Sequence, residues 1–422
     1  MKKGVAPFLC KAFGILLCAA ILTFNYMEPM SSLRRLSEDI HLQAGKSYRL
    51  PVETNSLFTA SSDDDMLAVS SLQDETLAQA TGASGGRTTR LTIRLLGVIP
   101  VKQVNIHVRD EITLVPGGTS IGVTLHTRGA LVVGVTSVVL SDGREVSPAA
   151  AAGIQAGDLI EKANGIEIKD ATHLAQICND SRDLVQLTVT RGKDRMTVDL
   201  RPVLDPADGK YRMGMWVRDS TAGVGTLSFY DPSSKWYAAL GHAITDVDTR
   251  MSLTVRDGEI VKSNIVDIVQ GAQGEPGELR GEFDPASLRL GSIETNSQYG
   301  IYGRMYKEYY NPLYPEGLPM AYPEEVKLGP AQLLTTLNDE GIKAYSCNII
   351  KLNSQESPAP KGMVIEITDP ALLEVTGGIV QGMSGSPLVQ NGKLIGVVTH
   401  VFINDPTKGY CMYAQWMQQQ IA

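Results

Sequence analysis

The decisive stretch of the sequence reads GMSGSPLVQNGKLIGVV over residues 382–398. Ser384 lies between Gly382 and Gly385, and glycines tolerate the backbone conformations that a tight turn requires. A serine hydroxyl is a useful nucleophile only when it is exposed, has a base nearby and has backbone N–H groups directed at the forming oxyanion. The stretch therefore predicts Ser384 as a nucleophile, with the N–H groups of Gly382 and Ser384 as its oxyanion hole.

The residues after this loop predict a β-hairpin. Apolar and polar side chains alternate from Pro387 to Val398 around Asn391-Gly392, a strong signal for a two-residue turn. The pattern G-x-S-G-x-P before a short hairpin resembles the nucleophile segment of chymotrypsin-like serine peptidases, with Ser386 where most of them carry a second glycine. The same residues could also form a plain turn between strands, so the rest of the chain has to decide.

Length and composition favour a β-rich protein of several domains. A chain of 422 residues is too long for one ordinary core and predicts two or three domains. The 41 glycines and the scarcity of long helical periodicities favour strands. A net charge of −8, without a basic stripe, argues against a nucleic-acid partner. Cys178, Cys347 and Cys411 predict neither a disulfide framework nor a metal site, and no cofactor is expected.

Residues 1–30 are predicted to be a targeting segment. Lys2, Lys3 and Lys11 come before an apolar run of thirteen residues from Ala12 to Phe24. A helix that spans a membrane needs about 20 apolar residues, so this run is short for one. The charge order and the length predict a secretory signal or a marginal membrane anchor.

Residues 31–112 are predicted to form a small β domain. Apolar and polar side chains alternate with period two in residues 48–52, 89–95 and 104–108. His41 and His107 are lone histidines and are interpreted as surface or satisfied strand residues, so the region predicts no catalytic site. A spacer or docking module is the expected role.

Residues 113–203 resemble a PDZ domain. The resemblance rests on a small-residue helix at 148–152, the run AGDLI at 156–160, an Asn164-Gly165 hairpin, a helix with an Asp170 N-cap, and closing strands at 185–190 and 196–200. PDZ domains bind an extended peptide by strand addition and capture its terminal carboxylate with the N–H groups of a loop. The resemblance places that loop at Ile121, Gly122 and Val123. The alternative is a docking domain with an empty groove.

Residues 204–422 are predicted to form the peptidase domain and should contain the base. They include two histidines, His242 and His400. In chymotrypsin-like peptidases the base comes from the first β-barrel and the nucleophile from the second. His242 precedes Ser384 by 142 residues, which suits two barrels, whereas His400 follows the nucleophile. We therefore expect His242 to be the general base.

A carboxylate should hold the imidazole in the required tautomer. Asp369 ends a predicted strand 15 residues before Ser384, although Asp-Pro also starts turns. Asp246, Asp248 and Asp267 are competitors by proximity or by strand placement. The residues alone leave this choice open.

The complete set of features resembles the stage IV sporulation protein B family of serine peptidases. The resemblance covers residues 1–30 and 113–422, and it rests on the N-terminal segment, the PDZ domain before the peptidase, and the motifs LGHA, TDP and GMSGSP. By motif, it implies Ser384 as nucleophile, His242 as general base and Asp369 as its orienting residue. It also implies a mainly β fold with a chymotrypsin-like double β-barrel.

The resemblance implies a signalling role. Family members are translocated across the forespore inner membrane into the intermembrane space, where they cut themselves near the N-terminus. They then cleave a membrane-bound regulator, stage IV sporulation protein FA, which triggers intramembrane proteolysis and activation of a late sigma factor. The expected partners are therefore such a regulator, the chain's own N-terminal region and a membrane.

Two alternatives belong to other functional classes. The first is an inactive scaffold whose PDZ domain binds partners; the pairing of an intact Ser384 loop with His242 argues against it. The second is a general envelope quality-control protease similar to the high-temperature-requirement family. Those enzymes place their PDZ domains after the peptidase, whereas Ser384 follows residues 113–203.

Overall fold

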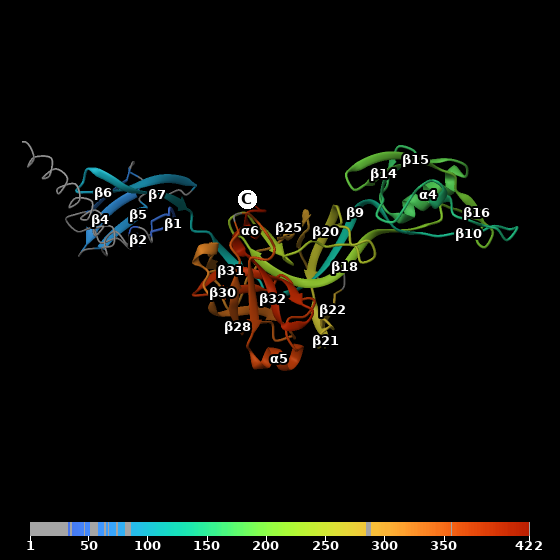
Figure 1. Cartoon of the computed structure of the whole chain (residues 1–422). Helices are drawn as coiled ribbons and strands as arrows, with labels where there is room; N and C mark the ends of the chain where they lie inside the picture. The colour runs from blue at the N-terminus through green and yellow to red at the C-terminus, as the bar shows by residue number, and fades with distance from the viewer. Residues whose placement is uncertain are drawn as a thin grey trace, which may run out of the picture. The chain divides into compact units, whose positions relative to one another are not determined.

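The computed structural model describes residues 33, 36–45, 47–50, 58–62, 65, 67–72, 75–80, 86–283, 288–355 and 357–421. The chain divides into two compact units, residues 1–112 and 113–422 (Figure 1). The targeting segment predicted at residues 1–30 lies outside the described residues. In the part of the chain that is described, no helix is long and apolar enough to cross a membrane.

The first unit is a small β structure. Its strands are β1 (Asp39–Gln43), β2 (Ser47–Leu50), β3 (Phe58–Ser62), β4 (Leu67–Leu72), β5 (Glu75–Ala80), β6 (Arg87–Leu95) and β7 (Ile99–Arg109). They form two sheets, ordered β1-β7-β6-β3 and β2-β5-β4. Leu91, Ile93, Val104 and Ile106 are fully buried between alternating polar positions of β6 and β7, as the period-two pattern predicts.

The second unit contains an open sheet, which is the first part of the peptidase. It is built from β8 (Thr113–Pro116), β9 (Ser120–Val135), β18 (Met215–Tyr230), β19 (Trp236–Ala239), β20 (Val255–Lys262), β23 (Arg289–Ser292), β24 (Thr295–Ser297), β25 (Gly300–Arg304) and β26 (Leu318–Pro319). The strands β9 and β18 are each 16 residues long and pair antiparallel, from Met215 with Val135 to Thr226 with Ser120. They form a ribbon that continues beyond the peptidase core (Figure 1).

The far half of this ribbon carries the PDZ-like module. Its further elements are β10 (Val138–Val139), β11 (Glu145–Val146), α3 (Pro148–Ala151), β12 (Leu159–Ala163), β13 (Ile166–Glu167), α4 (Ala171–Ser181), β14 (Val185–Arg191), β15 (Asp194–Leu200), β16 (Val203–Asp205) and β17 (Lys210–Arg212). The Asn164-Gly165 turn and the Asp170 N-cap form as predicted, and the Asp170 carboxylate accepts from His173 N–H at 2.7 Å. The module is thus an insertion between two paired strands of the peptidase.

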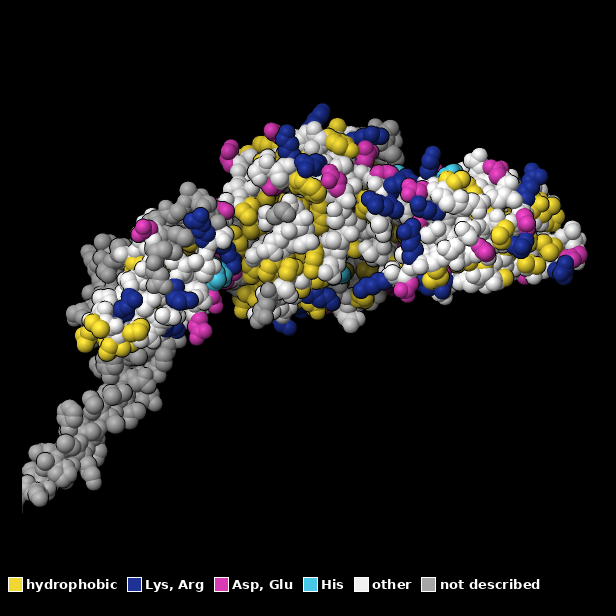
Figure 2. All heavy atoms as spheres, turned by 90° about the horizontal axis from the view of Figure 1, so that it is seen from above, with side chains coloured by type: hydrophobic (Ala, Val, Ile, Leu, Met, Phe, Trp, Pro, Cys, Tyr) yellow, Lys and Arg dark blue, Asp and Glu magenta, His cyan; other side chains and the backbone are white. Residues whose placement is uncertain are grey.

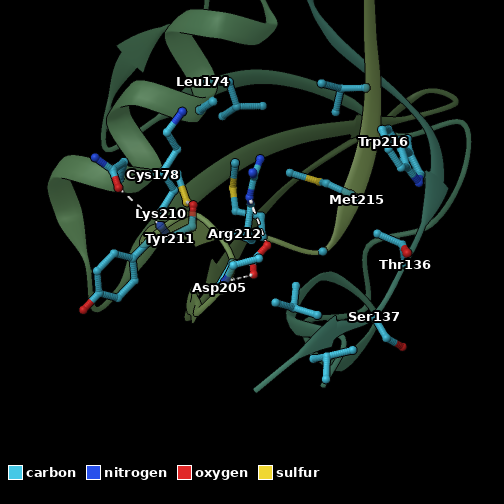
Figure 3. Close-up of a pocket in the computed structure, with 18 of the residues that line it drawn as sticks. Thr136, Ser137, Leu174, Cys178, Asp205, Lys210, Tyr211, Arg212, Met215 and Trp216 are labelled. Carbon is cyan, nitrogen blue, oxygen red and sulfur yellow. Dashed lines mark hydrogen bonds and ion pairs between the residues drawn. The ribbon is translucent and has the colours of Figure 1, made fainter. Parts of the chain in front are cut away.

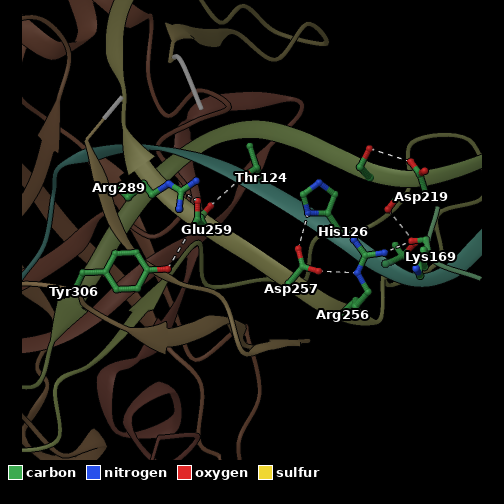
Figure 4. Close-up of polar contacts among 11 residues, drawn as sticks. Thr124, His126, Lys169, Asp219, Arg256, Asp257, Glu259, Arg289 and Tyr306 are labelled. Carbon is green, nitrogen blue, oxygen red and sulfur yellow. Dashed lines mark hydrogen bonds and ion pairs between the residues drawn. The ribbon is translucent and has the colours of Figure 1, made fainter. Parts of the chain in front are cut away.

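Polar contacts tie the start of α4 to the ribbon and to the neighbouring strand (Figure 4). The Asp219 carboxylate accepts from Ala171 N–H at 2.7 Å, and Arg256 of β20 donates to the Lys169 carbonyl. Asp257 accepts from Arg256 at 2.6 Å and lies 2.7 Å from His126 of β9. These bonds hold the first turn of α4 against β18 and β20.

The second part of the peptidase is a closed barrel in the order β27-β28-β29-β32-β31-β30. These strands are β27 (Gly329–Thr336), β28 (Ile342–Leu352), β29 (Met363–Ile367), β30 (Pro387–Gln390), β31 (Lys393–Phe402) and β32 (Asp405–Tyr413), with helices α5 (Pro370–Thr376) and α6 (Ala414–Gln418). The remaining elements are β21 (Asn264–Val269), β22 (Glu278–Glu282) and the 3₁₀ turn η1 (Pro323–Glu325). Asn391 and Gly392, with φ of 51° and 72°, form the predicted hairpin turn.

The mainly β prediction is confirmed, with two differences. Of the two expected barrels, the second is closed in the described residues, whereas the first is an open sheet. The strands are also shared differently between the domains. Residues 113–128 belong to the peptidase sheet and not to the PDZ domain that the sequence predicts for them. Val115, Ile121 and Val123 pack with Leu227 in the peptidase core. Alternation predicts a strand but does not say which sheet the strand joins.

The described surface carries both acidic and basic side chains. On the face shown in Figure 2, basic and acidic side chains are interspersed over the described residues. The chain has 38 Lys and Arg against 46 Asp and Glu. On the face in Figure 2, the basic side chains of the described residues do not form a continuous stripe.

Candidate active site

The nucleophile loop connects α5 to β30 and depends on two glycines in left-handed backbone conformations. Gly382 and Gly385 each have a φ of +94°. A Cβ on Gly385 would lie 2.3 Å from the Thr226 carbonyl oxygen and 2.5 Å from the Leu240 nitrogen. Only glycine fits there, because both the φ angle and the close approach exclude a side chain.

The loop leaves two N–H groups free to bind an anion. Among the described residues, neither Gly382 N–H nor Ser384 N–H donates a hydrogen bond. Their neighbours do: Met383 N–H donates to the Val380 carbonyl at 3.1 Å and Gly385 N–H to the Val398 carbonyl at 2.8 Å. Two unpaired donors on either side of Met383, next to a serine hydroxyl, are what an oxyanion hole needs.

His242 follows a strained turn at the end of β19. Leu240 and Gly241 have φ values of 71° and 72°, and a positive φ is unfavourable for leucine. Such strain is common at functional sites, where the surroundings hold the backbone in place. The His242 Nδ1 atom lies 2.9 Å from the Ala243 carbonyl oxygen, and burial lowers the pKa of the imidazole below its usual 6.5. A neutral imidazole at pH 7 is ready to accept a proton.

The two predicted catalytic side chains share one pocket. It has a volume of about 200 Å³ and is lined by His242, Ile379, Val380, Gln381, Ser384, Thr399, His400 and Val401. The Ser384 Oγ donates to the Thr399 carbonyl at 3.3 Å rather than to His242. Catalytic hydrogen bonds are often long or absent without substrate, so this geometry is compatible with a serine–histidine pair.

His400 also lies in this pocket. Its ring centroid is 5.8 Å from that of His242, with 43° between the ring planes. Burial, then the charge of His242 and that of Lys361, lowers the pKa of His400. Chain order argues against His400 as the base, because it follows the nucleophile. The signal for its presence in the pocket is its place on β31, the second strand of the hairpin that follows Ser384.

Asp369 has a different role in the structure from the one expected. Its carboxylate caps α5 by accepting from Ala371 N–H at 3.0 Å and Leu372 N–H at 3.3 Å, and it also accepts from Ser346 N–H at 3.0 Å. It does not line the pocket of Ser384 and His242. The prediction that it orients His242 is not supported by these contacts.

The other carboxylates considered as partners of His242 also bond to other residues. Asp246 accepts from Arg218 and Thr249, Asp248 accepts from Arg218 at 2.8 Å, and Asp267 accepts from Arg280 at 3.1 Å. In the described part of the chain, the acceptor beside His242 Nδ1 is therefore the Ala243 carbonyl.

The prediction of the PDZ carboxylate-binding loop is wrong. Ile121, Gly122 and Val123 lie inside β9, paired with β18 on one edge and β20 on the other. With both edges bonded, these residues have no free backbone to offer a peptide. Apolar-Gly-apolar marks such loops in sequence, but the same pattern also fits a buried strand: a Cβ on Gly122 would lie 2.3 Å from the ring of Phe283.

A groove lies between α4 and the beginning of β18 (Figure 3). The cavity has a volume of about 880 Å³, with Leu174 and Cys178 from α4 facing Met215 and Trp216 from β18. Within the described strands, residues 215–218 pair with β9 on one edge only. Gly214, with a φ of 71°, opens this edge in a second apolar-Gly-apolar run, Met213-Gly214-Met215, which is the sequence signal that was missed.

The fold and the site together define a serine peptidase with a PDZ domain. A family model described as SpoIVB peptidase S55 matches residues 209–418, and a PDZ domain model matches residues 139–191. The chain belongs to the SpoIVB peptidase S55 family, as its motifs predict. A search of curated proteins finds no match.

Proposed function

We propose that this peptidase cleaves itself near its N-terminus and then cleaves a membrane-bound sporulation regulator similar to stage IV sporulation protein FA. The cut triggers intramembrane proteolysis and activates a late sigma factor. The catalytic proposal rests on one observation: His242 and Ser384 line the same pocket, beside two unpaired N–H groups. Membership of the SpoIVB family supports the signalling part.

The reaction is acyl transfer through a serine ester. His242 takes the proton of Ser384 as Oγ attacks the peptide carbonyl, and the imidazolium then protonates the leaving amine. The N–H groups of Gly382 and Ser384 bind the oxyanion that forms in each of the two half-reactions. Water, deprotonated by His242, releases the acyl group and restores the serine.

The place of action is the space between the two forespore membranes. The lysines and the apolar run of residues 1–30 support translocation across the inner membrane, followed by anchoring or by release after self-cleavage. The substrate is then on the same side of the membrane as the peptidase.

The groove between α4 and β18 captures an extended peptide. Its free strand edge supports β-augmentation, and the Met213-Gly214-Met215 loop supports capture of a terminal carboxylate. The captured peptide belongs to the substrate, to a second copy, or to the N-terminal region of the same chain.

Expression of the parent chain and of Ser384→Ala, with mass measurement over time, tests the catalytic proposal. The parent should shorten from its N-terminal side while the variant stays full length. If both stay intact and a serine-directed phosphonate does not label Ser384, the protein is a binding scaffold instead.

The groove is best tested by filling it, because deletion of residues 113–203 would also remove β8 and β9 of the peptidase. Ala175→Phe places a ring in the cavity from α4, whereas Gln176→Phe adds the same ring on the same helix outside the cavity. Only the first should change the rate or timing of substrate cleavage. Equal rates in both variants and the parent would remove the groove from the mechanism.

A further inference from the structure

Thr226 of β18 contacts the nucleophile loop with its backbone and with its side chain. The residue is 1% exposed. Its N–H donates to the Ser384 carbonyl at 3.1 Å, and its Oγ1 donates to the Gly382 carbonyl at 2.7 Å. Its own carbonyl accepts from Leu240 N–H at 3.2 Å, in the turn that precedes His242. One residue thus bonds to the loops of both predicted catalytic side chains.

These bonds fix the peptide groups on both sides of the Met383–Ser384 peptide, which carries the Ser384 N–H of the oxyanion hole. In a planar trans peptide the C=O and N–H point in opposite directions, so bonding both ends fixes the orientation of the plane. Thr226 Oγ1 holds the carbonyl of the Gly382–Met383 peptide, while the Met383 N–H is bonded to Val380. Thr226 N–H holds the carbonyl of the Ser384–Gly385 peptide, whose N–H is bonded to Val398.

Ser386 extends this arrangement. Its fully buried Oγ lies 3.5 Å from Thr226 Oγ1, at the outer limit of a hydrogen bond, and Thr226 Oγ1 in turn donates to the Gly382 carbonyl. Ser386, at a position where chymotrypsin-like peptidases usually have glycine, thus packs its hydroxyl against that of Thr226.

We infer that Thr226 is a positioning residue for the peptidase reaction: with Ser386, it holds the nucleophile loop so that the Gly382 and Ser384 N–H groups face the oxyanion. The inference rests on the proposed role of Ser384 as nucleophile. The Thr226 hydroxyl touches neither substrate nor proton; it acts through the Gly382 carbonyl. Loss of the hydroxyl therefore affects the stabilisation of the oxyanion, while substrate binding and the base stay as they are.

The test compares Thr226→Val, Thr226→Ser and Thr335→Val in the full chain. Thr335 is a fully buried threonine of β27 whose Oγ1 has no hydrogen-bond partner among the described residues, so its variant makes the same chemical change away from the loop. The probe is a fluorophosphonate, whose attack by serine needs the same oxyanion hole. Labelling rates are measured against probe concentration and pH, together with the thermal midpoint.

Thr226→Val should lower the maximal labelling rate about 10- to 100-fold, less than the loss of a whole oxyanion donor. The half-saturating probe concentration and the pH midpoint should stay unchanged. Thr226→Ser should restore the rate to within about threefold, because it keeps the hydroxyl, and Thr335→Val should match the parent.

Two results would overturn the inference: unchanged labelling in Thr226→Val, or equal losses in the serine and valine variants. A parent chain that is not labelled at Ser384 would instead reject the nucleophile itself, so the two failures are distinguishable.

Discussion

The closed barrel and the open sheet of the peptidase hold their candidate catalytic side chains by different means. The Ser384 loop is held mainly by backbone bonds, such as Gly385 N–H to the Val398 carbonyl. His242 lies in the segment between β19 and β20, where side chains from other strands add to the backbone bonds. The Asn296 side chain bonds both the N–H and the carbonyl of Ile244, and Asp246 accepts from Arg218. Single substitutions should therefore disturb the base more easily than the nucleophile.

Removal of the base should give the largest effect. His242→Gln should lower peptidase activity by about 10⁴- to 10⁶-fold, because the serine then loses its proton acceptor. His400→Gln is the matched control in the same pocket and should lower activity by about tenfold at most. Turnover and thermal midpoints of both variants check this, and the reverse order of effects would assign the base to the closed barrel.

Removal of the buried carboxylate of the His242 segment should give the largest loss of stability. The Asp246 side chain is fully buried and Asp248 is half exposed, and Arg218 bonds to both. Asp246→Ala should lower the free energy of unfolding by roughly 3–5 kcal/mol, because the Asp248 and Thr249 N–H groups lose their buried acceptor and Arg218 keeps only its half-exposed partner. Asp248→Ala should cost about 1 kcal/mol or less. Urea unfolding measures both, and equal values would contradict the role given to Asp246.

The same pair has a pH signature. Burial alone would raise the pKa of Asp246, but hydrogen bonds from Thr249 and Arg218 outweigh it and bring the pKa below 3.8. A lowered folded-state pKa gives stability that is present above pH about 4 and is lost as the pH falls through the folded value. The parent should therefore lose stability more steeply than Asp246→Asn on acidification, as measured by unfolding at several pH values.

Substitution of the α5 cap should give a smaller effect on the closed barrel. Asp369→Ala should cost about 1–2 kcal/mol through loss of the cap, and Asp369→Asn should keep most of it because asparagine also caps helices well. If Asp369 only caps α5, the asparagine variant should keep its activity within a few-fold. A fall of about 10⁴-fold in kcat with unchanged stability would instead make Asp369 the orienting residue of His242.

The smallest expected effect is a shift in the midpoint of the pH profile of peptidase activity. The base must be neutral to accept the serine proton, and burial lowers the pKa of His242 below 6.5. Activity should therefore rise with pH to a plateau, with a midpoint below 6.5. An acid limb centred above 6.5 would mean that another group, or a charged partner, controls the base.

Local turn chemistry made much of the fold predictable. Asn391-Gly392 and Asp170 form the predicted turn and cap, because a few neighbouring residues decide such features. The insertion of the PDZ domain was not predictable, since the pairing of β9 with β18 joins residues about 90 positions apart in the chain, and alternation does not encode partners. Ser384 and His242 were recognisable by motif, but Thr226 stands in an ordinary strand and has no local signal.

The insertion also affects the order of folding. During synthesis, β9 leaves the ribosome before β18, and the whole PDZ module emerges between them. Pairing two strands across a long unstructured loop has an entropic cost, which slows folding. A folded module instead brings its two ends together at the spacing of neighbouring strands, about 5 Å. The module can thus fold first and align the two strands for pairing. In this way the folded PDZ domain promotes the assembly of the open peptidase sheet, which comes before the closed barrel in the chain.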